Sequence, residues 1–314
     1  MGKLIMQNQK FTYFIAASRP KTLFASLSPV ILSLALAQQF SPFQWIMAIL
    51  CLLVALLLQI ASNLANDFVD GEKGIDGPQR TGPQRMTASG LLNASEIKLA
   101  FYITVFLAIL LGIYPMIIGG PFIVAIGVSS LLFSYLYSGG PYPLSHYALG
   151  EISAFIFFGL LVTLGTAYLQ MREVLFIHEN LVTFLVIACL QGAYSFVLLG
   201  INNLRDIHSD AKVNKMTLAT ILGASKHKIL LLFVLIIPFV MTGVLAWKLH
   251  FYMHLYSFIL LPKVWRLGNF ILNNKVDAGL NQALAQTAKV QFIHSIMLAA
   301  TLVLFTMLKK GFFN

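Results

Sequence analysis

Two short polar stretches of this chain combine carboxylate and amide side chains at helical spacing. Their members are Asn63, Asn66, Asp67 and Asp70 in the first stretch and Asn202, Asn203, Asp206 and Asp210 in the second. Residues three, four and seven positions apart share one face of an α-helix, so each stretch presents its oxygens together. Hard oxygen donors of this kind suit Mg²⁺, which proteins commonly share with a phosphate group. The two stretches therefore predict a divalent metal site.

The two stretches also match each other in sequence. Asn66-Asp67-x-x-Asp70 aligns with Asn202-Asn203-x-x-Asp206, and each follows an apolar run of helical length. Five of the chain's 11 acidic residues lie in or beside these stretches: Asp67, Asp70, Asp76, Asp206 and Asp210. Crowded carboxylates repel one another unless cations bridge them. We therefore expect the stretches to face each other across a cavity and these five aspartates to hold the metal.

Basic residues accompany both stretches. The candidates for phosphate contacts are Arg19, Lys21, Lys73, Arg80, Arg85, Arg205 and Lys215. Arginine and lysine bind phosphate oxygens well, and the amides of Asn63, Asn66, Asn202 and Asn203 can ligate metal or orient substrate. Acids, amides and bases together fit a metal–diphosphate site better than a bare ion site. For any single Lys or Arg, contact with an anionic lipid is the alternative.

The composition is that of a membrane protein. The chain has 314 residues, of which 58% are hydrophobic and 10% charged, and its mean hydropathy is +0.82. A soluble domain does not have this profile, and long apolar runs recur throughout. Helices satisfy their own backbone hydrogen bonds inside the bilayer. We therefore expect an all-α, polytopic membrane protein.

The apolar runs predict the positions of the helices. At about 20 residues per crossing, we expect nine transmembrane helices, at residues 22–38, 43–66, 96–118, 120–138, 150–170, 180–201, 227–247, 251–271 and 287–308. Pro262, Lys263 and Arg266 interrupt the eighth run, which allows it to end near Leu261. We expect one domain, residues 1–314, built from two related helical halves (about 1–140 and 141–314) around a central cavity open to the cytoplasm and to lipid.

The basic residues are distributed unevenly between the two predicted membrane faces. Of 21 Lys and Arg, 17 fall at the N-terminus, in or just after the loops that follow the second and sixth helices, or around the end of the eighth. Basic residues gather on the cytoplasmic side of membrane proteins. This places the N-terminus and both acidic stretches in the cytoplasm. A cytoplasmic excess of Lys and Arg accounts for the net charge of +10 without nucleic acid, and we expect no nucleic-acid partner.

Three further features receive structural interpretations. Ser95 and Glu96 have the residue types of a helix cap ahead of residues 96–118. The stretch 138–143, Ser-Gly-Gly-Pro-Tyr-Pro, lacks the context of a nucleotide loop and predicts a tight turn. Glu151 begins the fifth helix, where it either complements the helix dipole or faces the cavity.

These residues resemble the UbiA superfamily of intramembrane prenyltransferases, and within it the branch that acts on 1,4-dihydroxy-2-naphthoate. The resemblance covers nearly the whole chain. Its marks are Arg19-Pro20-Lys21-Thr22, residues 63–70 with Lys73-Gly74 and Asp76, Arg80-Thr81-Gly82-Pro83, Gly150-Glu151-Ile152, and residues 202–210 with Lys215 and Thr217-Leu218-Ala219. Two positions depart from the branch: Asn214 stands where Gly is usual, and Met216 where a basic or other residue often precedes Thr.

The resemblance implies a Mg²⁺-dependent reaction between a polyprenyl diphosphate and 1,4-dihydroxy-2-naphthoate, with loss of diphosphate and carbon dioxide. It implies that Asp67, Asp70, Asp206 and Asp210, with Asp76, organise the metal. Arg80, Arg85, Arg205 and Lys215 would contact diphosphate, and Arg19 and Lys21 the aromatic carboxylate or phosphate.

Two alternatives remain at this stage. Within the family, the acceptor can be another aromatic compound, such as 4-hydroxybenzoate or homogentisate. Outside it, a cation-coupled secondary transporter also combines internal repeats with acidic residues in the membrane. A transporter's acids are expected near the membrane midplane, whereas these lie at helix ends among Arg and Lys, which favours an anionic substrate.

Overall fold

The computed structural model describes residues 2–72, 82 and 85–311, and their secondary structure is helical. The first half contains α1 (Gly2–Ala17), α2 (Pro20–Ala37), α3 (Trp45–Glu72), α4 (Ala94–Leu136) and the short 3₁₀ helix η1 (Leu144–His146). The next segments are α5 (Gly150–Ala154), η2 (Phe155–Leu161), α6 (Val162–Met171), η3 (Arg172–Phe176) and α7 (His178–Arg205). The chain ends with α8 (Ile207–Lys212), α9 (Leu218–Lys248), η4 (Tyr252–Leu260), α10 (Leu261–Asn273) and α11 (Leu280–Gly311).

The protein is a multi-pass membrane protein. Among the described residues, six helices are long and apolar enough to cross a membrane, or seven if the bent pair α1–α2 forms one span. They are α3, α4, the continuous segment from α5 to η3, α7, α9 and α11. All nine ranges expected from the sequence fall on helical segments. The number of membrane crossings stays a prediction.

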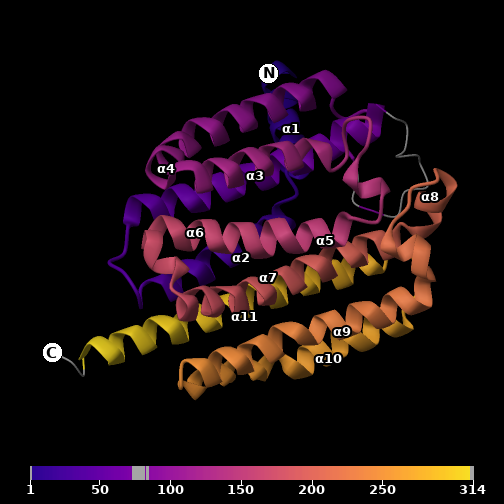
Figure 1. Cartoon of the computed structure of the whole chain (residues 1–314). Coiled ribbons are helices and arrows are strands. Elements are labelled where there is room, and N and C mark those ends of the chain that lie inside the picture. The colour runs from indigo at the N-terminus through magenta and orange to yellow at the C-terminus, as the bar shows by residue number, and fades with distance from the viewer. Residues whose placement is uncertain (1, 73–81, 83–84, 312–314) are drawn as a thin grey trace.

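Helix α4 contains two of the expected helices, joined by a reversal at Gly120 (Figure 1). Gly120 has φ 63° and ψ −157°, a conformation that a side chain disfavours. Gly127 in the second half lies beside the terminal methyl group of Met116 in the first, so the two halves of α4 pack against each other here.

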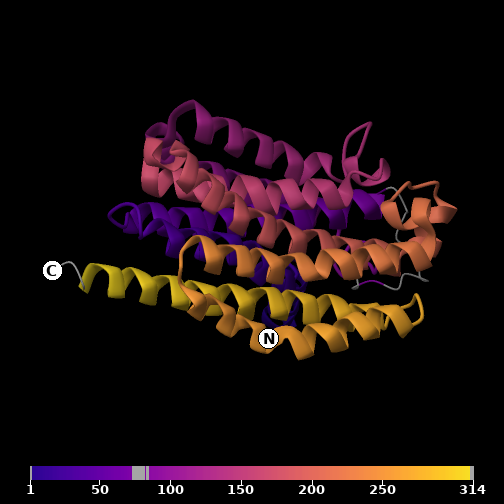
Figure 2. The ribbon, with the colours of Figure 1, turned by 60° about the horizontal axis from the view of Figure 1, so that its bottom comes forward.

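Helix α7 is the central column of the bundle. It packs against α9, η2, α11 and α2, and its side chains Ile187, Leu190, Tyr194 and Ile201 are fully buried. The α4 and α9 helices instead expose large apolar side chains, as expected for helices that face lipid. Segments η4 and α10 close one side of the bundle against α9 and α11 (Figure 2). The second polar stretch thus stands at the end of the most buried helix.

Buried polar contacts tie α7 to its neighbours within the membrane. Gln191 donates to the hydroxyl of Ser295 (2.7 Å), and Tyr194 shares a hydrogen bond with Nδ1 of His294 (2.8 Å). The other ring nitrogen of His294 lies 3.0 Å from the hydroxyl of Thr242. Interhelical hydrogen bonds of this kind fix the register of packed helices inside a bilayer.

Two expectations about helix ends meet different outcomes. The eighth predicted range, 251–271, is helical almost throughout, and the alternative end near Leu261 is wrong, because η4 runs directly into α10 with Pro262 in its first turn. Proline is tolerated there because the first amides of a helix need no intrahelical acceptor. The N-cap of α4 is Asn93 and not Ser95: Glu96 accepts from the backbone amide of Asn93 at 2.9 Å, which forms a capping box.

The approach of η2 to α7 gives a testable prediction. A Cβ atom on Gly159 would lie 2.5 Å from Cα of Gly192 and 2.8 Å from the carbonyl oxygen of Ala188. We expect Gly159→Ala to lower the unfolding free energy by about 1–3 kcal/mol, as measured by thermal unfolding in detergent. A Cβ on Gly243 meets nothing within 4 Å, so Gly243→Ala is the matched control and should not lower stability. Equal melting temperatures for the two variants would contradict the close packing.

Candidate functional site

The two polar stretches lie at the same end of the bundle (Figure 1). The first occupies the last turns of α3, which continues to Glu72, beyond the end at residue 66 expected from the sequence. The second occupies the end of α7, and Asp206 separates α7 from the short helix α8, which carries Asp210. Both stretches are therefore presented by helix ends.

A cavity of about 780 Å³ opens between these ends. The predicted site residues that line it are Arg19, Asn63, Asn66, Arg85, Asn202, Asn203, Arg205, Asp206, Asp210 and Lys215. Its remaining wall includes apolar side chains, among them Phe133, Phe158 and Leu198. One cavity thus combines amides, carboxylates and cations with an apolar surface.

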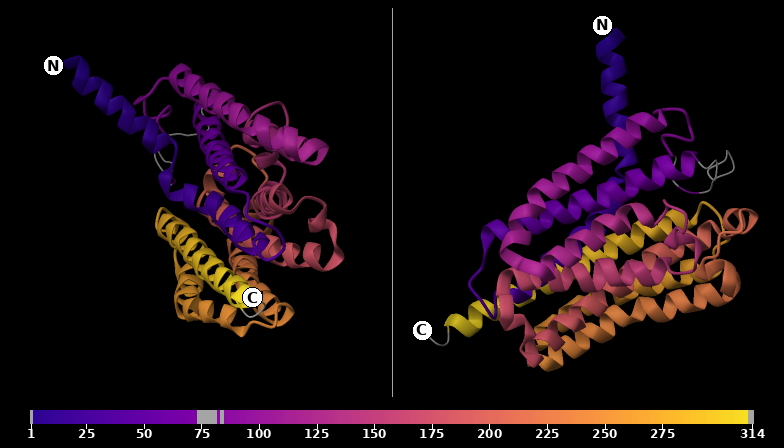
Figure 3. Two further views of the ribbon diagram at one scale, coloured as in Figure 1. Left: turned by 90° about the vertical axis from the view of Figure 1, so that its left-hand side faces the viewer. Right: turned by 45° about the horizontal axis from the view of Figure 1, so that its top comes forward.

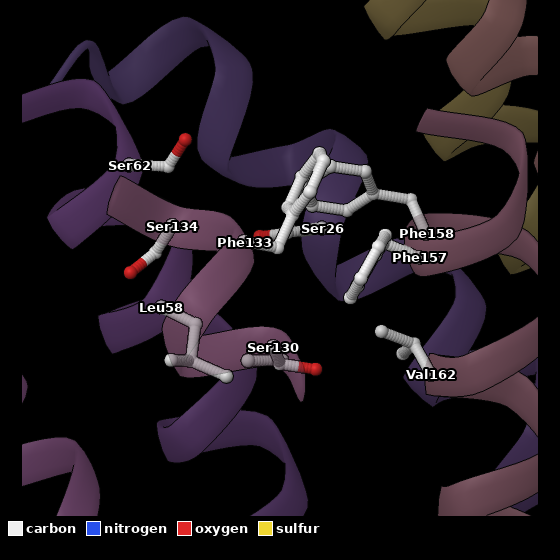
Figure 4. Close-up of a pocket in the computed structure, with 10 residues that line it drawn as sticks. Ser26, Leu58, Ser62, Ser130, Phe133, Ser134, Phe157, Phe158 and Val162 are labelled. Carbon is white, nitrogen blue, oxygen red and sulfur yellow. The ribbon is translucent and has the colours of Figure 1, made fainter. Parts of the chain in front are cut away.

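The apolar part of the wall continues into a small side pocket of about 40 Å³ (Figure 4). The pocket shares Ser62, Phe133 and Phe158 with the cavity and is closed by side chains such as Leu58 and Phe157. The rings of Phe133 and Phe157 are stacked with their centroids 4.0 Å apart. The lining therefore changes from charged and amide side chains at the helix ends to aromatic, aliphatic and serine side chains within the bundle.

Arg205 and Asp206 form the best-connected ion pair of the site. Both carboxylate oxygens of Asp206 accept from Arg205, at 2.8 Å from Nε and 2.6 Å from Nη2. The same guanidinium donates to the side-chain oxygens of Asn202 and Asn281, each at 2.7 Å. The Arg205 side chain is only 1% exposed. Arg205 therefore orients Asp206 and ties the start of α11 to the end of α7.

Asp210 and Lys215 are also paired, and the two departures from the family pattern, Asn214 and Met216, stand on either side of Lys215. The Lys215 ammonium lies 3.3 Å from a carboxylate oxygen of Asp210. Asn214 has φ 52°, a left-handed conformation that suits asparagine as well as glycine. Met216 uses its backbone carbonyl to accept from the amide of Ala148 at 2.9 Å, while its side chain is 49% exposed. Neither departure disturbs this loop.

Two of the amides are oriented by hydrogen bonds, one to a residue that lines the cavity and one to a residue buried beside it. Asn66 accepts a hydrogen bond from the hydroxyl of Ser138, and Asn203 donates to Glu151 at 2.9 Å. Glu151 is fully buried in the first turn of α5 and is not among the described residues that line the cavity. Of the two alternatives for Glu151, the cavity-facing one is therefore wrong, and the carboxylate instead holds the Asn203 amide.

Asp67 differs from the other predicted metal ligands. Its side chain is 2% exposed, and it is not among the described cavity-lining residues. Its two oxygens accept from the backbone amides of Met86 (3.0 Å) and Thr87 (2.9 Å). The Asn63 amide is likewise engaged, since it donates to the carbonyl of Ser18 at 2.9 Å.

The remaining predicted residues are not placed. Lys73, Asp76 and Arg80 lie outside the described residues, and the side chains of Lys21 and Asp70 are not described either. Within the described part of the chain, no group of three or more His, Cys, Asp or Glu side chains is arranged to hold a metal ion. The five-aspartate metal set stays a prediction.

Sequence reasoning missed several residues that line the cavity, including Gln59, Tyr137, Ser138, Ser195 and Asn281. Ser138 lies in the glycine-rich stretch that the sequence predicted to be a turn. Its place in the cavity wall and its hydrogen bond to Asn66 were not predicted. Asn281 gives no local signal, because only the packing of α11 against α7 brings it to Arg205.

Comparison with known proteins decides the family. The model of the UbiA prenyltransferase family matches residues 26–296. The chain belongs to the UbiA prenyltransferase family. It is 31% identical to the 1,4-dihydroxy-2-naphthoate octaprenyltransferase of Haemophilus influenzae, over 95% of this chain and 98% of that one. It is 37% identical to the enzyme of the same name from Escherichia coli, over 67% of this chain and 68% of that one.

Solved UbiA structures have the same fold. A UbiA homologue from Aeropyrum pernix superposes with a TM-score of 0.65 at 14% identity, over 90% of this chain and 97% of that one. A homologue from Archaeoglobus fulgidus bound to DMAPP and Mg²⁺ has a TM-score of 0.62 at 13% identity, over 92% and 98% of the two chains. The helical architecture is therefore that of the family.

The buried Arg205 pair gives a second prediction. Arg205→Met would leave Asp206 charged without its partner and remove the donors to Asn202 and Asn281. We expect the variant to lose about 3 kcal/mol of unfolding free energy, because an ion left unpaired in a desolvated site is strongly destabilising. Lys212→Met removes an exposed cation from the same cavity and is the control, with little expected change. Thermal unfolding in detergent measures both; an unchanged Arg205→Met would contradict the structural importance of this pair.

Proposed function

We propose that this protein transfers a polyprenyl group from a polyprenyl diphosphate to 1,4-dihydroxy-2-naphthoate, releasing diphosphate and carbon dioxide and forming demethylmenaquinol, the reduced form of demethylmenaquinone. One observation carries the proposal: a single cavity has carboxylates, amides and cations at its helix-end wall and aromatic and aliphatic side chains deeper in the bundle. A polyprenyl diphosphate has the same division between a charged head and an apolar tail. The names of the bacterial relatives support the naphthoate acceptor.

The diphosphate head fits the helix-end wall. Arg19, Arg85 and Lys215 line it and bring positive charge toward phosphate oxygens. Asn66, Asn202, Asp206 and Asp210 line the same wall, and their amide and carboxylate oxygens are hard donors of the kind that suits Mg²⁺. With Asp70 and Asp76 proposed from the sequence, these residues would hold the metal. Bound Mg²⁺ would supply positive charge that stabilises the departing diphosphate.

The reaction breaks two bonds and forms one at the reacting carbons. It needs no separate proton donor or acceptor at the ring carbon. The allylic C–O bond breaks and its electron pair leaves with diphosphate. The ring carbon that bears the carboxylate forms the new bond to the allylic carbon. The carboxylate then leaves as carbon dioxide, and the electrons of that C–C bond restore the aromatic ring. We propose Arg19 and Lys21 as the cations that orient the acceptor's carboxylate or contact the diphosphate.

The apolar wall protects this chemistry. Phe133 and Phe158 line the cavity, and the face of an aromatic ring can stabilise a nearby cation. Water would quench an allylic cation, and burial within the bundle keeps water away. We further propose that the cavity opens to the cytoplasm, since most Lys and Arg fall on that predicted side.

A product assay tests the proposal. Purified protein is incubated with Mg²⁺, a polyprenyl diphosphate and either 1,4-dihydroxy-2-naphthoate or 4-hydroxybenzoate, and products are identified by mass. We expect a prenylated naphthoate that lacks the mass of carbon dioxide. Product from 4-hydroxybenzoate alone would transfer the proposal to another acceptor, and no product from either would reject it.

The same assay tests the aspartates. Asp206→Asn and Asp70→Asn each remove one charged ligand without a large change in volume, so we expect activity to fall by at least about a hundredfold. Size-exclusion profiles in detergent should show that both variants remain folded. Asp206→Asn should melt at a lower temperature than wild type, because Arg205 loses its charged partner. Full turnover by either variant would refute its metal assignment.

A further inference from the structure

One face of α3 holds the wall of the cavity in place. Asn63, Asp67 and Gly71 follow one another at intervals of four residues, so they lie on the same side of the helix. Each contacts backbone or side-chain atoms of another segment rather than only open cavity. Asn66 lies on a neighbouring face and lines the cavity.

Asn63 holds the segment that carries Arg19. Its amide donates to the carbonyl of Ser18 (2.9 Å) and to the hydroxyl of Thr22 (3.2 Å), which stand on either side of the junction between α1 and α2. The two helices meet there at a bend of 53° (Figure 3). Arg19 has φ 53°, a conformation that a side-chain-bearing residue adopts only when its surroundings hold it. Asn63 provides contacts on both sides of this strained residue.

Asp67 holds the segment that carries Arg85. Its two oxygens accept from the backbone amides of Met86 and Thr87, the two residues directly after Arg85. Both Asp67 and Arg85 are buried, at 2% and 6% exposure, and Arg85 lines the cavity. Hydrogen bonds from two consecutive amides to one carboxylate fix the direction of the backbone at this point.

Gly71 completes the contact with the Arg85 segment. A Cβ atom at this position would lie 2.7 Å from Cγ2 and 2.9 Å from Cβ of Thr87. Both distances are far below a van der Waals contact, so the segment lies against the bare backbone of α3. A side chain here would displace Thr87 and loosen the hydrogen bonds to Asp67.

We propose that Asn63 and Asp67 are positioning residues, which set Arg19 and Arg85 in the cavity wall, and that Asp67 does not ligand the metal. This inference rests on the proposed function for its kinetic test. It assigns a different role to Asp67 from the metal-binding one that its motif predicts. A metal at Asp67 would compete with two backbone amides. The oxygens of Asp206 are also engaged, by Arg205, but Asp206 lines the cavity, whereas Asp67 is not among the described residues that line it. Arg19, positioned by Asn63, and Arg85, positioned by Asp67, are then the groups that bind the negative charge of the substrate.

Steady-state kinetics separates positioning from metal binding. In Asp67→Asn, one backbone amide loses its acceptor and the Arg85 segment shifts. We expect the KM for polyprenyl diphosphate to rise about tenfold, as in Arg85→Ala, while the Mg²⁺ concentration for half-maximal rate stays within about twofold of wild type. Gly71→Ala leaves every carboxylate in place and should reproduce the rise in KM. A tenfold increase in required Mg²⁺ for Asp67→Asn, absent from Gly71→Ala, would overturn the proposal.

Double-mutant cycles test which arginine each anchor serves. The effects of Asp67→Asn and Arg85→Ala on KM should be non-additive, because both remove the contact between Arg85 and the diphosphate. The effects of Asp67→Asn and Arg19→Ala should add. Asn63→Ala should show the opposite pattern, coupled to Arg19 and additive with Arg85. Additivity of both anchors with both arginines would show that the anchors do not act through these side chains.

Two measurements do not depend on turnover. Hydrogen exchange in the peptide around residues 85–92 should be faster in Asp67→Asn and Gly71→Ala than in wild type. Mn²⁺ titration in the presence of inorganic diphosphate, followed by electron paramagnetic resonance, should be unchanged in Asp67→Asn and weakened in Asp206→Asn. Loss of Mn²⁺ binding in Asp67→Asn would overturn the inference. If wild type failed to prenylate naphthoate, the function would be rejected while the exchange data still tested the anchor.

Discussion

The hydrogen-bonded pair of Arg205 and Asp206 stands where the apolar bundle becomes the polar cavity, and the arrangement of the site depends on it. Carboxylates and cations are costly at a desolvated helix end unless each has a fixed partner. Arg205 supplies that partner to Asp206 and also binds Asn202 and Asn281, so one guanidinium joins α7 to the beginning of α11. The most buried helix of the bundle, α7, thereby ends next to a carboxylate whose orientation is fixed by two hydrogen bonds.

The two polar stretches divide their work between neighbouring helix faces. Adjacent residues on an α-helix point about 100° apart, so a pair such as Asn66 and Asp67 serves two directions at once. Asn66 lines the cavity, whereas Asp67 binds the backbone after Arg85. At the second stretch, Asn202 accepts from Arg205, and Asn203 reaches back to Glu151. A motif of closely spaced polar residues therefore contains both groups that meet a ligand and groups that hold the cavity wall.

The sequence was sufficient for the all-helical membrane fold, because apolar runs of about 20 residues form helices in a bilayer. The nine crossings and the two related halves stay predictions. The sequence also predicted the residue types of the cavity, because charged residues are rare in this chain and those near the two stretches occur together. It failed where tertiary packing decides. Asn281 reaches Arg205 only through the packing of α11, and the direction of Asp67 depends on the backbone of Met86 and Thr87. Pro262 suggested an interruption, but its position in a first helical turn makes it compatible with α10.

The central claim is that the ends of α3 and α7 hold one diphosphate ligand between them. Isothermal titration of a non-reactive prenyl thiolodiphosphate, with and without Mg²⁺, tests this directly on wild type, Asn66→Ala, Asp206→Asn and the double variant. We predict Mg²⁺-dependent binding that each single variant weakens by about tenfold. The double variant should lose less binding free energy than the sum of the two single losses, because both helix ends act on one ligand. Unchanged affinity in either single variant, with the protein still folded, would contradict the shared site.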